Sequence, residues 1–396
     1  MSTFKKTSTV HVSTPYMASG VTAHELKLLG FNVLRTQNNS VEFDGSLEDC
    51  MKLNLHLRTA SRVMYLLFEF DAVNADKLYN GIRNYDWEKW LEPNGYFSVQ
   101  SFTNNETINN TLFTNLKVKD AIADRFIEYH GRRPDSGPSK EGVIVFVHWV
   151  NDHAAVYLDT SGDSLARHGY RKIPLQAPLQ ENLAASMVLS TQWKPEQHFV
   201  NPMCGSGTLA IEAALIKANK PPGLIKKEFA FKYLKGYDDA VWEKMLILAE
   251  GNVVTKPFGA KIIATDISQD AVQAAKINAK LAGVDHFIDF DTCVLEDTKV
   301  PQDGVGGAVV MNPPYGDRLG DEQRLEALYT RVGDFMKQSC KGYFGYVFTG
   351  NADLAKKIGL KPKRRMIFYN AKIECRLLEF ELYSGTRKVK PTADTE

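Results

Sequence analysis

The pattern of hydrophobic and polar residues changes about halfway along the chain. Residues 9–57 predict the order strand, helix, strand, strand, helix, and residues 62–160 predict a second mixture of strands and helices. Alternating hydrophobic positions indicate strands, whereas hydrophobic residues three or four positions apart indicate helices. The first half of the chain therefore predicts α+β structure. Its second stretch has expected strands at residues 62–70, 96–101, 143–150 and 153–159, and expected helices at residues 75–84 and 117–129.

A different pattern begins at His198. It reads strand, glycine-rich turn, helix, strand, helix, which predicts a doubly wound α/β sheet. Residues 220–257 are an inserted segment with an amphipathic helix of their own, residues 239–250. A connector, residues 161–194, is kept extended by Pro174 and Pro178 before a helix at residues 182–190. Further strands are expected at residues 199–200, 261–265, 287–294, 307–311 and 345–349, helices at 209–218, 269–282, 325–339 and 354–357, and a hairpin at 367–369 and 374–383.

Composition excludes several classes of protein. A chain of 396 residues is long for a single core, and its longest apolar run, residues 142–150, is too short to cross a bilayer. The first 14 residues lack the apolar region of a signal peptide, and the five cysteines contain no CxxC pair. We therefore expect a cytoplasmic protein with neither a disulfide framework nor a metal site. The 48 Lys and Arg residues nearly balance the 47 Asp and Glu residues, so nucleic-acid binding would require local basic patches.

Candidate chemistry gathers where the expected parallel strands end. Residues 201–208, Asn-Pro-Met-Cys-Gly-Ser-Gly-Thr, form a turn whose glycines let the backbone approach a ligand before a helix N-terminus. The second strand ends at Asp266, which is placed to bind ribose hydroxyls. Asp266 lies about 60 residues after the glycine-rich turn, whereas the corresponding acid of a dinucleotide site usually lies ~20 residues after it, so an ordinary dinucleotide site is not favoured. Glu296 and Asp297 follow the third strand. Because carboxyl ends of parallel strands meet at one edge of a sheet, we expect these groups to line one crevice.

The fourth strand ends in residues 312–316, Asn-Pro-Pro-Tyr-Gly, a sequence suited to holding a nucleobase. The side-chain oxygen of Asn312 and the carbonyl of Pro313 can accept the two N–H bonds of an exocyclic amine, while Tyr315 stacks on the base. The motif reads an NH2 group, and by itself it does not choose guanine over adenine. The site needs no ionisable base, and Cys204 is interpreted as a small residue that fits its turn rather than as a nucleophile.

Three groups of basic residues are candidates for contacts with an RNA backbone, with solvent-exposed helix faces as the alternative interpretation. They are Lys117, Lys119, Arg125, Arg132 and Arg133; then Arg167, Arg171 and Lys172; then Lys361, Lys363, Arg364 and Arg365.

These motifs resemble a known family. The turn at residues 201–208, Asp266 and the run Asn-Pro-Pro-Tyr-Gly-Asp-Arg-Leu at residues 312–319 resemble class I S-adenosyl-L-methionine-dependent methyltransferases of exocyclic amines. Residues 165–171 and 177–185 resemble the connector of THUMP-domain methyltransferases, and the whole chain is most similar to the RlmL-like guanine-N2 methyltransferases of large-subunit ribosomal RNA. The resemblance implies a ferredoxin-like domain at residues 1–60, a THUMP domain at 61–160, the connector at 161–194, a Rossmann-type methyltransferase domain at 195–385 and a disordered tail from 386.

The resemblance also implies roles for individual residues. Asp266 and the adjacent Ile267 would bind the ribose end of S-adenosyl-L-methionine, and Glu181 and Asn182 would close its methionine end from the connector. The turn residues that would surround the methionine part are Asn201, Pro202, Cys204, Gly205, Gly207 and Thr208, with Asn312 also near the cofactor, and the residues that would hold the target base are Asn312, Pro313, Pro314 and Tyr315.

Three positions depart from the family pattern. Asn201 stands where aspartate is common, and Ala371 follows Asn370 where glycine is usual. The aspartate usually found after the third strand has no clear counterpart, and Asp291, Glu296 and Asp297 stay open as candidates.

The expected function is methyl transfer to the 2-amino group of a guanine in ribosomal RNA. Two alternatives stay open: an adenine-N6 methyltransferase acting on DNA or RNA, and a noncatalytic RNA-binding or assembly protein that keeps the fold. The sequence does not decide the oligomeric state.

Overall fold

The computed structural model describes residues 3–106, 108–173, 179–316 and 322–383. They form two compact units: the first contains the described residues of Met1–Gly169, Glu181–Ser186 and Asn219–Val253, and the second contains those of Tyr170–Gln180, Met187–Ala218 and Val254–Glu396. The expectations for Pro174 and Pro178, for residues 317–319 and for the tail from residue 386 lie outside the described residues. Within the described ranges, no helix is long and apolar enough to cross a membrane.

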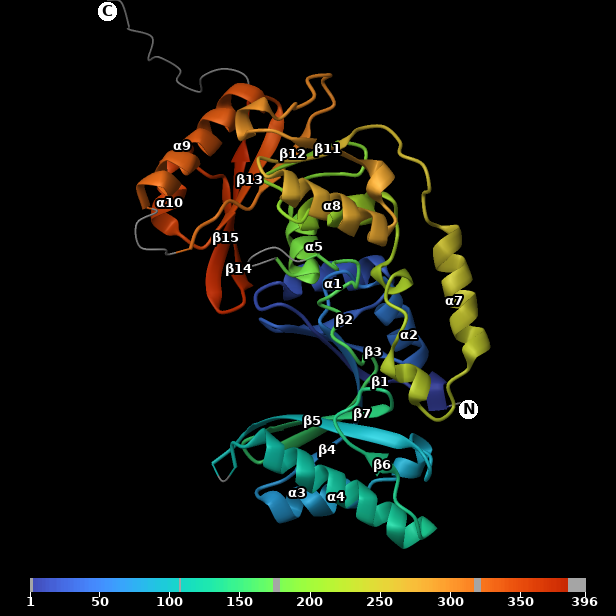
Figure 1. Ribbon diagram of the computed structural model, residues 1–396. Coiled ribbons are helices and arrows are strands. Elements are labelled where there is room, and N and C mark those ends of the chain that lie inside the picture. Colours follow the sequence, from blue (N-terminus) through green and yellow to red (C-terminus); the bar gives the residue numbers. More distant parts are fainter. Residues whose placement is uncertain (1–2, 107, 174–178, 317–321, 384–396) are drawn as a thin grey trace, which may run out of the picture. The chain divides into compact units, whose positions relative to one another are not determined.

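The described strands of the first unit form one continuous sheet in the order β2-β3-β1-β4-β8-β7-β5-β6 (Figure 1). β4 (Arg62–Asp71) pairs antiparallel with β1 (Ser8–Ser13) on one side and with β8 (His153–Asp159) on the other. The two α+β patterns seen in the sequence therefore share one sheet, joined at β4. The remaining strands are β2 (Val33–Thr36), β3 (Ser40–Gly45), β5 (Tyr96–Asn104), β6 (Asp135–Ser136) and β7 (Val143–Val150).

The helices of the first unit begin and end at recognisable caps. The Ser46 hydroxyl accepts the Asp49 N–H and the Asp49 carboxylate accepts the Ser46 N–H, a capping box that starts α2 (Leu47–His56). The Asn110 side chain starts α4 (Thr111–His130), which stops at the left-handed Gly131. The other helices are α1 (Ser19–Leu28), α3 (Ala75–Arg83) and α7 (Asp239–Gly251).

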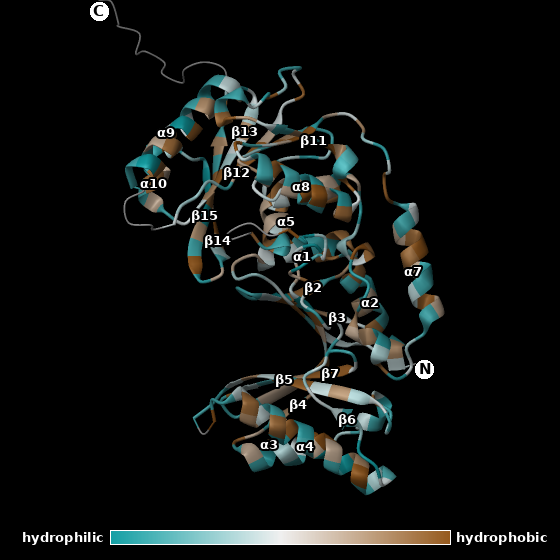
Figure 2. Cartoon of the chain, viewed as in Figure 1, coloured by the Kyte–Doolittle hydropathy of each residue, from teal (hydrophilic) through white to brown (hydrophobic). Residues whose placement is uncertain are grey.

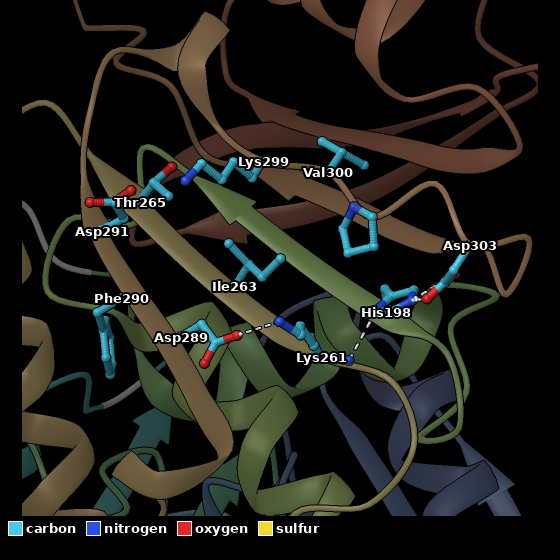
Figure 3. A pocket seen from close by; sticks show the side chains of 11 residues that line it. His198, Lys261, Ile263, Thr265, Asp289, Phe290, Asp291, Lys299, Val300 and Asp303 are labelled. Carbon is cyan, nitrogen blue, oxygen red and sulfur yellow. Dashed lines mark hydrogen bonds and ion pairs between the residues drawn. The ribbon is translucent and has the colours of Figure 1, made fainter.

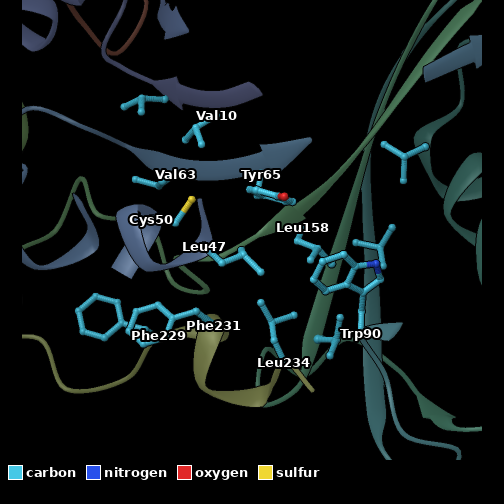
Figure 4. Close-up of a cluster of buried hydrophobic side chains, with 14 of the residues drawn as sticks. Val10, Leu47, Cys50, Val63, Tyr65, Trp90, Leu158, Phe229, Phe231 and Leu234 are labelled. Carbon is cyan, nitrogen blue, oxygen red and sulfur yellow. The ribbon is translucent and has the colours of Figure 1, made fainter. Parts of the chain in front are cut away.

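Residues 220–253 of the inserted segment belong to the first unit, although the sequence placed the segment within the catalytic domain. Phe229, Phe231 and Leu234 of this segment join the same buried cluster as Tyr65 of β4 and Leu158 of β8 (Figure 4). All five side chains are at most 3% exposed. Burial of this apolar surface, at roughly 25 cal/mol per Å², holds the insertion against the sheet.

The second unit has the doubly wound sheet that the sequence predicted. Its strand order is β11-β10-β9-β12-β13-β15-β14, and the first five strands are parallel. β15 runs antiparallel to both of its neighbours. The strands are β9 (His198–Pro202), β10 (Ile262–Asp266), β11 (Ile288–Thr292), β12 (Gly307–Met311), β13 (Tyr343–Thr349), β14 (Arg364–Asn370) and β15 (Ile373–Glu381).

Helices cover the two faces of this sheet. α6 (Thr208–Lys217) and α8 (Gln269–Ala282) pack on β9, β10 and β11. α9 (Glu322–Ser339) packs on the other face, where the core includes Val200 and Val309, and α10 (Ala352–Lys357) packs on α9. Hydrophilic residues cover much of the outer side of α9 (Figure 2). Helix α5 (Glu181–Ser190) begins in the first unit and ends in the second.

Candidate active site

The turn after β9 is built around two glycines with left-handed backbone. Gly205 has φ 54° and Gly207 has φ 82°. A Cβ at Gly207 would lie 2.8 Å from the Cβ of Ala275, so a side chain there would push against α8. At Gly205, no heavy atom of the described residues lies within 4 Å of the corresponding point. Gly207 thus allows close helix packing, and Gly205 leaves space beside the N-terminus of α6.

Asp266 fixes this turn to the end of β10. One carboxylate oxygen accepts the N–H of Gly205 at 2.9 Å, and the other accepts the N–H of Ser268 at 2.9 Å. A carboxylate has about four acceptor sites, so it can still bind ribose hydroxyls. Beside it, Ile267 leaves 72% of its surface exposed and offers an apolar contact.

Two asparagines, the buried Asn201 and the half-buried Asn312, have buried acceptor oxygens without partners among the described residues. The side-chain nitrogen of Asn201 donates to the carbonyl of Val310 at 2.8 Å, which ties β9 to β12. Its oxygen Oδ1, and the Oδ1 of Asn312, are buried and have no hydrogen-bond partner among the described residues. An unpaired buried acceptor costs about 1–3 kcal/mol, so both oxygens suit a ligand that supplies N–H donors.

Tyr315 is held by residues from other strands. Its hydroxyl accepts a hydrogen bond from the side-chain nitrogen of Asn370 at 2.9 Å and lies 3.6 Å from the Cys375 sulfur. Its ring meets Phe348 edge to face, with centroids 6.2 Å apart. Burial raises the pKa of Tyr315, so its hydroxyl stays protonated. The sequence had singled out Asn370 only for the geometry of its turn, because residue spacing does not show a contact across 55 positions.

Cys204 lies within the turn, but its environment does not suit a nucleophile. The residue is 9% exposed, and burial and then the charge of Asp266 raise the pKa of its thiol. The neutral form is therefore favoured, as expected for a small residue that fits its turn.

Glu181 and Asn182 open α5 and fall in the first unit, whereas the turn, Asp266 and residues 312–315 fall in the second. Both are buried, and the side-chain nitrogen of Asn182 donates to the Ser61 hydroxyl at 3.1 Å and the Ala60 carbonyl at 3.3 Å. Within the described residues, Oδ1 of Asn182 has no partner. The contact of Glu181 and Asn182 with the cofactor stays a prediction.

The three acids left open after the third strand have different surroundings. Glu296 forms a two-pronged ion pair with Arg331, at 2.6 and 2.7 Å, and these hydrogen bonds lower the pKa of its carboxyl group. Asp291 lines a hollow of about 450 Å³ against β9, β10 and β11, together with His198 and Lys261 (Figure 3). The hollow lies beside residues 293–306. In this segment, all of which the structure describes, the only helical residues are Leu295–Asp297, a short 3-10 turn, and there is no α-helix. In the part of the chain that the structure describes, no side chain pairs with Asp297.

One residue predicted to contact RNA, Arg125, forms ion pairs within the protein. The side chain of Arg125 is 10% exposed, and its guanidinium pairs with Asp86 and Glu88, each at 2.8 Å. These ion pairs engage the guanidinium within the protein, and the contact of Arg125 with RNA stays a prediction. Among its neighbours, Lys117 lies over the ring of Tyr79, and the other residues predicted with it, Lys119, Arg132 and Arg133, are half-buried or exposed.

The other predicted RNA contacts are partly engaged. Arg167 is exposed in the first unit, and Arg171, in the second, donates to the Leu179 carbonyl at 2.7 Å. Lys363 pairs with Glu381 at 3.0 Å, and Arg364 pairs with Glu379 at 3.3 Å.

The third basic group borders a second hollow, of about 720 Å³, which we call the lysine hollow. Strand register places it away from residues 312–315: Met311 lies beside Val347 near the carboxyl end of β13, whereas Glu381 of the hollow lies beside Phe344 near its start. The lysine hollow therefore lies near the amino-terminal ends of the parallel strands, whereas residues 312–315 lie at their carboxyl-terminal ends. Among the described residues, the lysines that line the hollow are Lys337, Lys341, Lys361 and Lys363.

Comparison with protein families accounts for most of the chain. Residues 168–379 match the RMKL-like methyltransferase domain, residues 12–64 the RlmL ferredoxin-like domain and residues 72–159 the THUMP domain. "Ribosomal RNA large subunit methyltransferase K/L" of Syntrophotalea carbinolica is 39% identical over 370 residues, which cover 91% of this chain and 52% of the relative. The chain thus spans about half the length of the curated K/L relatives that it matches.

Solved structures have the same fold over nearly the whole chain. SMU.472, crystallised with SAH (S-adenosyl-L-homocysteine), has a TM-score of 0.86 at 29% identity and covers 96% of this chain and 100% of its own. A "predicted N6-adenine-specific DNA methylase" from Listeria monocytogenes has a TM-score of 0.85 at 30% identity, with 96% and 97% covered. These matches confirm the fold class, the family resemblance and the cofactor class expected from the sequence.

Proposed function

Because the chain belongs to the family with the RMKL-like methyltransferase domain, we propose that it methylates the exocyclic 2-amino group of a guanine in ribosomal RNA. Large-subunit RNA is the expected target, since the K/L relatives carry that name. The observation that carries the proposal is the buried, unpartnered Oδ1 of Asn312, directly before Pro313.

The second unit fits S-adenosyl-L-methionine, whose sulfonium supplies an electrophilic methyl group. The Oδ1 of Asn201 can accept from the amine of the methionine part, and the N-terminus of α6 favours its carboxylate. Asp266 can accept from ribose hydroxyls, and Ile267 can pack against the adenine. Asp297, whose carboxylate no described side chain engages, is our candidate for the acid that contacts the adenine.

The residues after β12 would orient the acceptor amine. An exocyclic amine is a poor nucleophile because its lone pair is delocalised into the ring, so alignment is the main task of the site. Asn312 and the Pro313 carbonyl would accept its two N–H bonds and turn the nitrogen towards the methyl group, with Pro314 stiffening the loop. The ring of Tyr315 would stack on the base, which is worth roughly 1–3 kcal/mol.

RNA would be held by basic residues outside this crevice. The candidates are Lys117, Lys119, Arg132, Arg133, Arg167, Arg171, Lys363 and Arg364, and a paired target guanine would have to leave its stack to reach Asn312.

The first prediction tests Asn312. Asn312→Ala removes the acceptor oxygen, and we expect transfer of labelled methyl groups to ribosomal RNA to fall at least 100-fold, because the amine is no longer oriented. Asn351→Ala is the matched control: its side chain caps α10 in the same unit, so it should cost about 1 kcal/mol of stability and leave transfer unchanged. Normal transfer by folded Asn312→Ala protein would refute the assignment.

The same assay separates the alternatives. Nucleoside mass spectrometry of the product should give N2-methylguanosine, whereas N6-methyladenosine would favour the adenine-N6 activity suggested by the name of the Listeria structure. Calorimetric titration with S-adenosyl-L-methionine should show binding, and its absence would favour a noncatalytic RNA-binding protein.

A further inference from the structure

We infer that Asn370 is a positioning residue for methyl transfer, because its side-chain amide holds the hydroxyl of Tyr315 and so sets how the tyrosine ring meets the target base. The inference rests on the proposed function and concerns the same crevice. Asn370 lies 55 residues after Tyr315 in the sequence, and its Nδ2 donates to the tyrosine hydroxyl at 2.9 Å.

The position of Asn370 is fixed by the hairpin of β14 and β15. It is the last residue of β14 and pairs with Ile373 across a two-residue turn, in which Ala371 has a left-handed φ of 54°. Cys375, which also contacts the Tyr315 hydroxyl, pairs with Phe368 in the same ladder. Among the described residues, both polar contacts to Tyr315 therefore come from this one hairpin, whose register is fixed by the β14–β15 ladder.

The ring of Tyr315 is confined on its apolar sides as well. Phe348 meets it edge to face with an interplanar angle of 84°. A Cβ at Gly350 would lie 3.1 Å from two ring carbons, closer than ordinary van der Waals contact, so glycine leaves just enough room for the ring. Packing limits where the ring can go, and the hydrogen bond from Asn370 limits its tilt within that space.

This arrangement assigns different tasks to the two parts of the tyrosine. Its hydroxyl is used within the protein, so it is not available to read the edges of a base. Its ring face is the part left for stacking, which is sequence-tolerant because every base has a π face. Selection of an amino group then falls to Asn312 and Pro313, and Asn370 acts only through Tyr315.

A double-mutant cycle tests this inference. Asn370→Ala and Tyr315→Phe each remove one partner of the hydrogen bond and keep the ring, so each should lower the single-turnover rate of methyl transfer to ribosomal RNA by about 3- to 10-fold. The double variant should be no slower than the slower single variant, because both changes remove the same interaction. The KM for S-adenosyl-L-methionine should not change. A residue that merely stabilised the hairpin would not produce this non-additivity.

Lys372→Ala is the matched control, since Lys372 is exposed in the same turn, and it should transfer methyl groups at the wild-type rate. Thermal midpoints measured for all variants separate slow transfer from unfolding. If the two losses multiply, or if folded Asn370→Ala is as fast as wild type, the positioning role is overturned while the proposed function stands. If the wild-type protein transfers no methyl group to RNA, both the proposed function and the positioning role of Asn370 are refuted.

Discussion

Gly205 and Gly207 share a left-handed backbone but have different surroundings, and this difference is testable. Gly207→Ala adds backbone strain and a clash with Ala275, so we expect it to reduce the free energy of unfolding by about 2–5 kcal/mol. Gly205→Ala adds strain in open space, and its cost should be about 1–2 kcal/mol. Urea denaturation followed by circular dichroism measures both losses.

Two further variants sharpen this comparison. Ala275→Gly, combined with Gly207→Ala, removes the atom that the new methyl group meets and should restore part of the loss. When Ala275→Gly is combined with Gly205→Ala, it should not restore any of the lost free energy of unfolding. Equal losses for the two glycine variants would contradict the packing role of Gly207.

Residues at or directly after the end of a strand could be located from the sequence, because the end of a strand is a local feature. Asp266 and Asn312 are examples: each comes immediately after a run of buried residues. Arg125 and Asn370 could not be interpreted in this way. Their contacts are with Asp86, Glu88 and Tyr315, and no spacing rule brings residues 37 to 55 positions apart into contact.

At the scale of elements, the sequence predicted the order of strands and helices better than their partners. Periodicity located β4, yet it could not show that this strand pairs with both β1 and β8 and so makes one sheet of two α+β patterns. The inserted segment is a similar case. Its helix was expected, but its packing in the first unit depends on Phe229 and Phe231, whose contacts are distant in sequence.

Lys226 ties this inserted segment to the first unit and gives it a pH dependence. Its ammonium group donates to the carbonyl of Asp163, and burial lowers the pKa of Lys226 to about 8. The unfolded chain keeps an ordinary lysine pKa near 10.4, so between these values the unfolded state binds more protons. The free energy of unfolding should therefore rise as the pH increases from about 8 towards 10.

The free energy of unfolding is measured against pH for the wild type and for variants, and the difference between them is compared, because other groups also titrate in this pH range. The stability of the wild type minus that of Lys226→Met should increase across this pH window, as the cost of burying the charge disappears. Lys227→Met, at the exposed neighbouring position, should show no such trend. A flat difference for Lys226→Met would mean that the ammonium group is not buried in solution.

At the scale of the whole molecule, charge sets a limit on how RNA can be bound. The net charge of +1 gives no general attraction for a polyanion, so affinity must come from local groups. The lysines of the lysine hollow form one such group. Strand register places them near the amino-terminal ends of the parallel strands, away from Asn312 at the carboxyl-terminal ends. Four strand residues separate the level of Asn312 from that of Phe344, which is at least about 13 Å at ~3.3 Å per residue. An RNA that reaches both places must extend well beyond the target nucleotide.

Lys341 and Lys361 carry the last prediction, because within the described residues neither forms an ion pair. Replacing both with glutamine should reduce the slope of log affinity against log salt by about 2 for a long ribosomal RNA fragment, since each lysine that meets a phosphate releases about one counterion. A short stem-loop around the target nucleotide should bind with an unchanged slope. Lys276→Gln with Lys280→Gln on α8 removes the same charge from exposed positions elsewhere in this unit and serves as the control. Equal changes for both double variants, or for both RNAs, would show that net charge, and not the lysine hollow, governs binding.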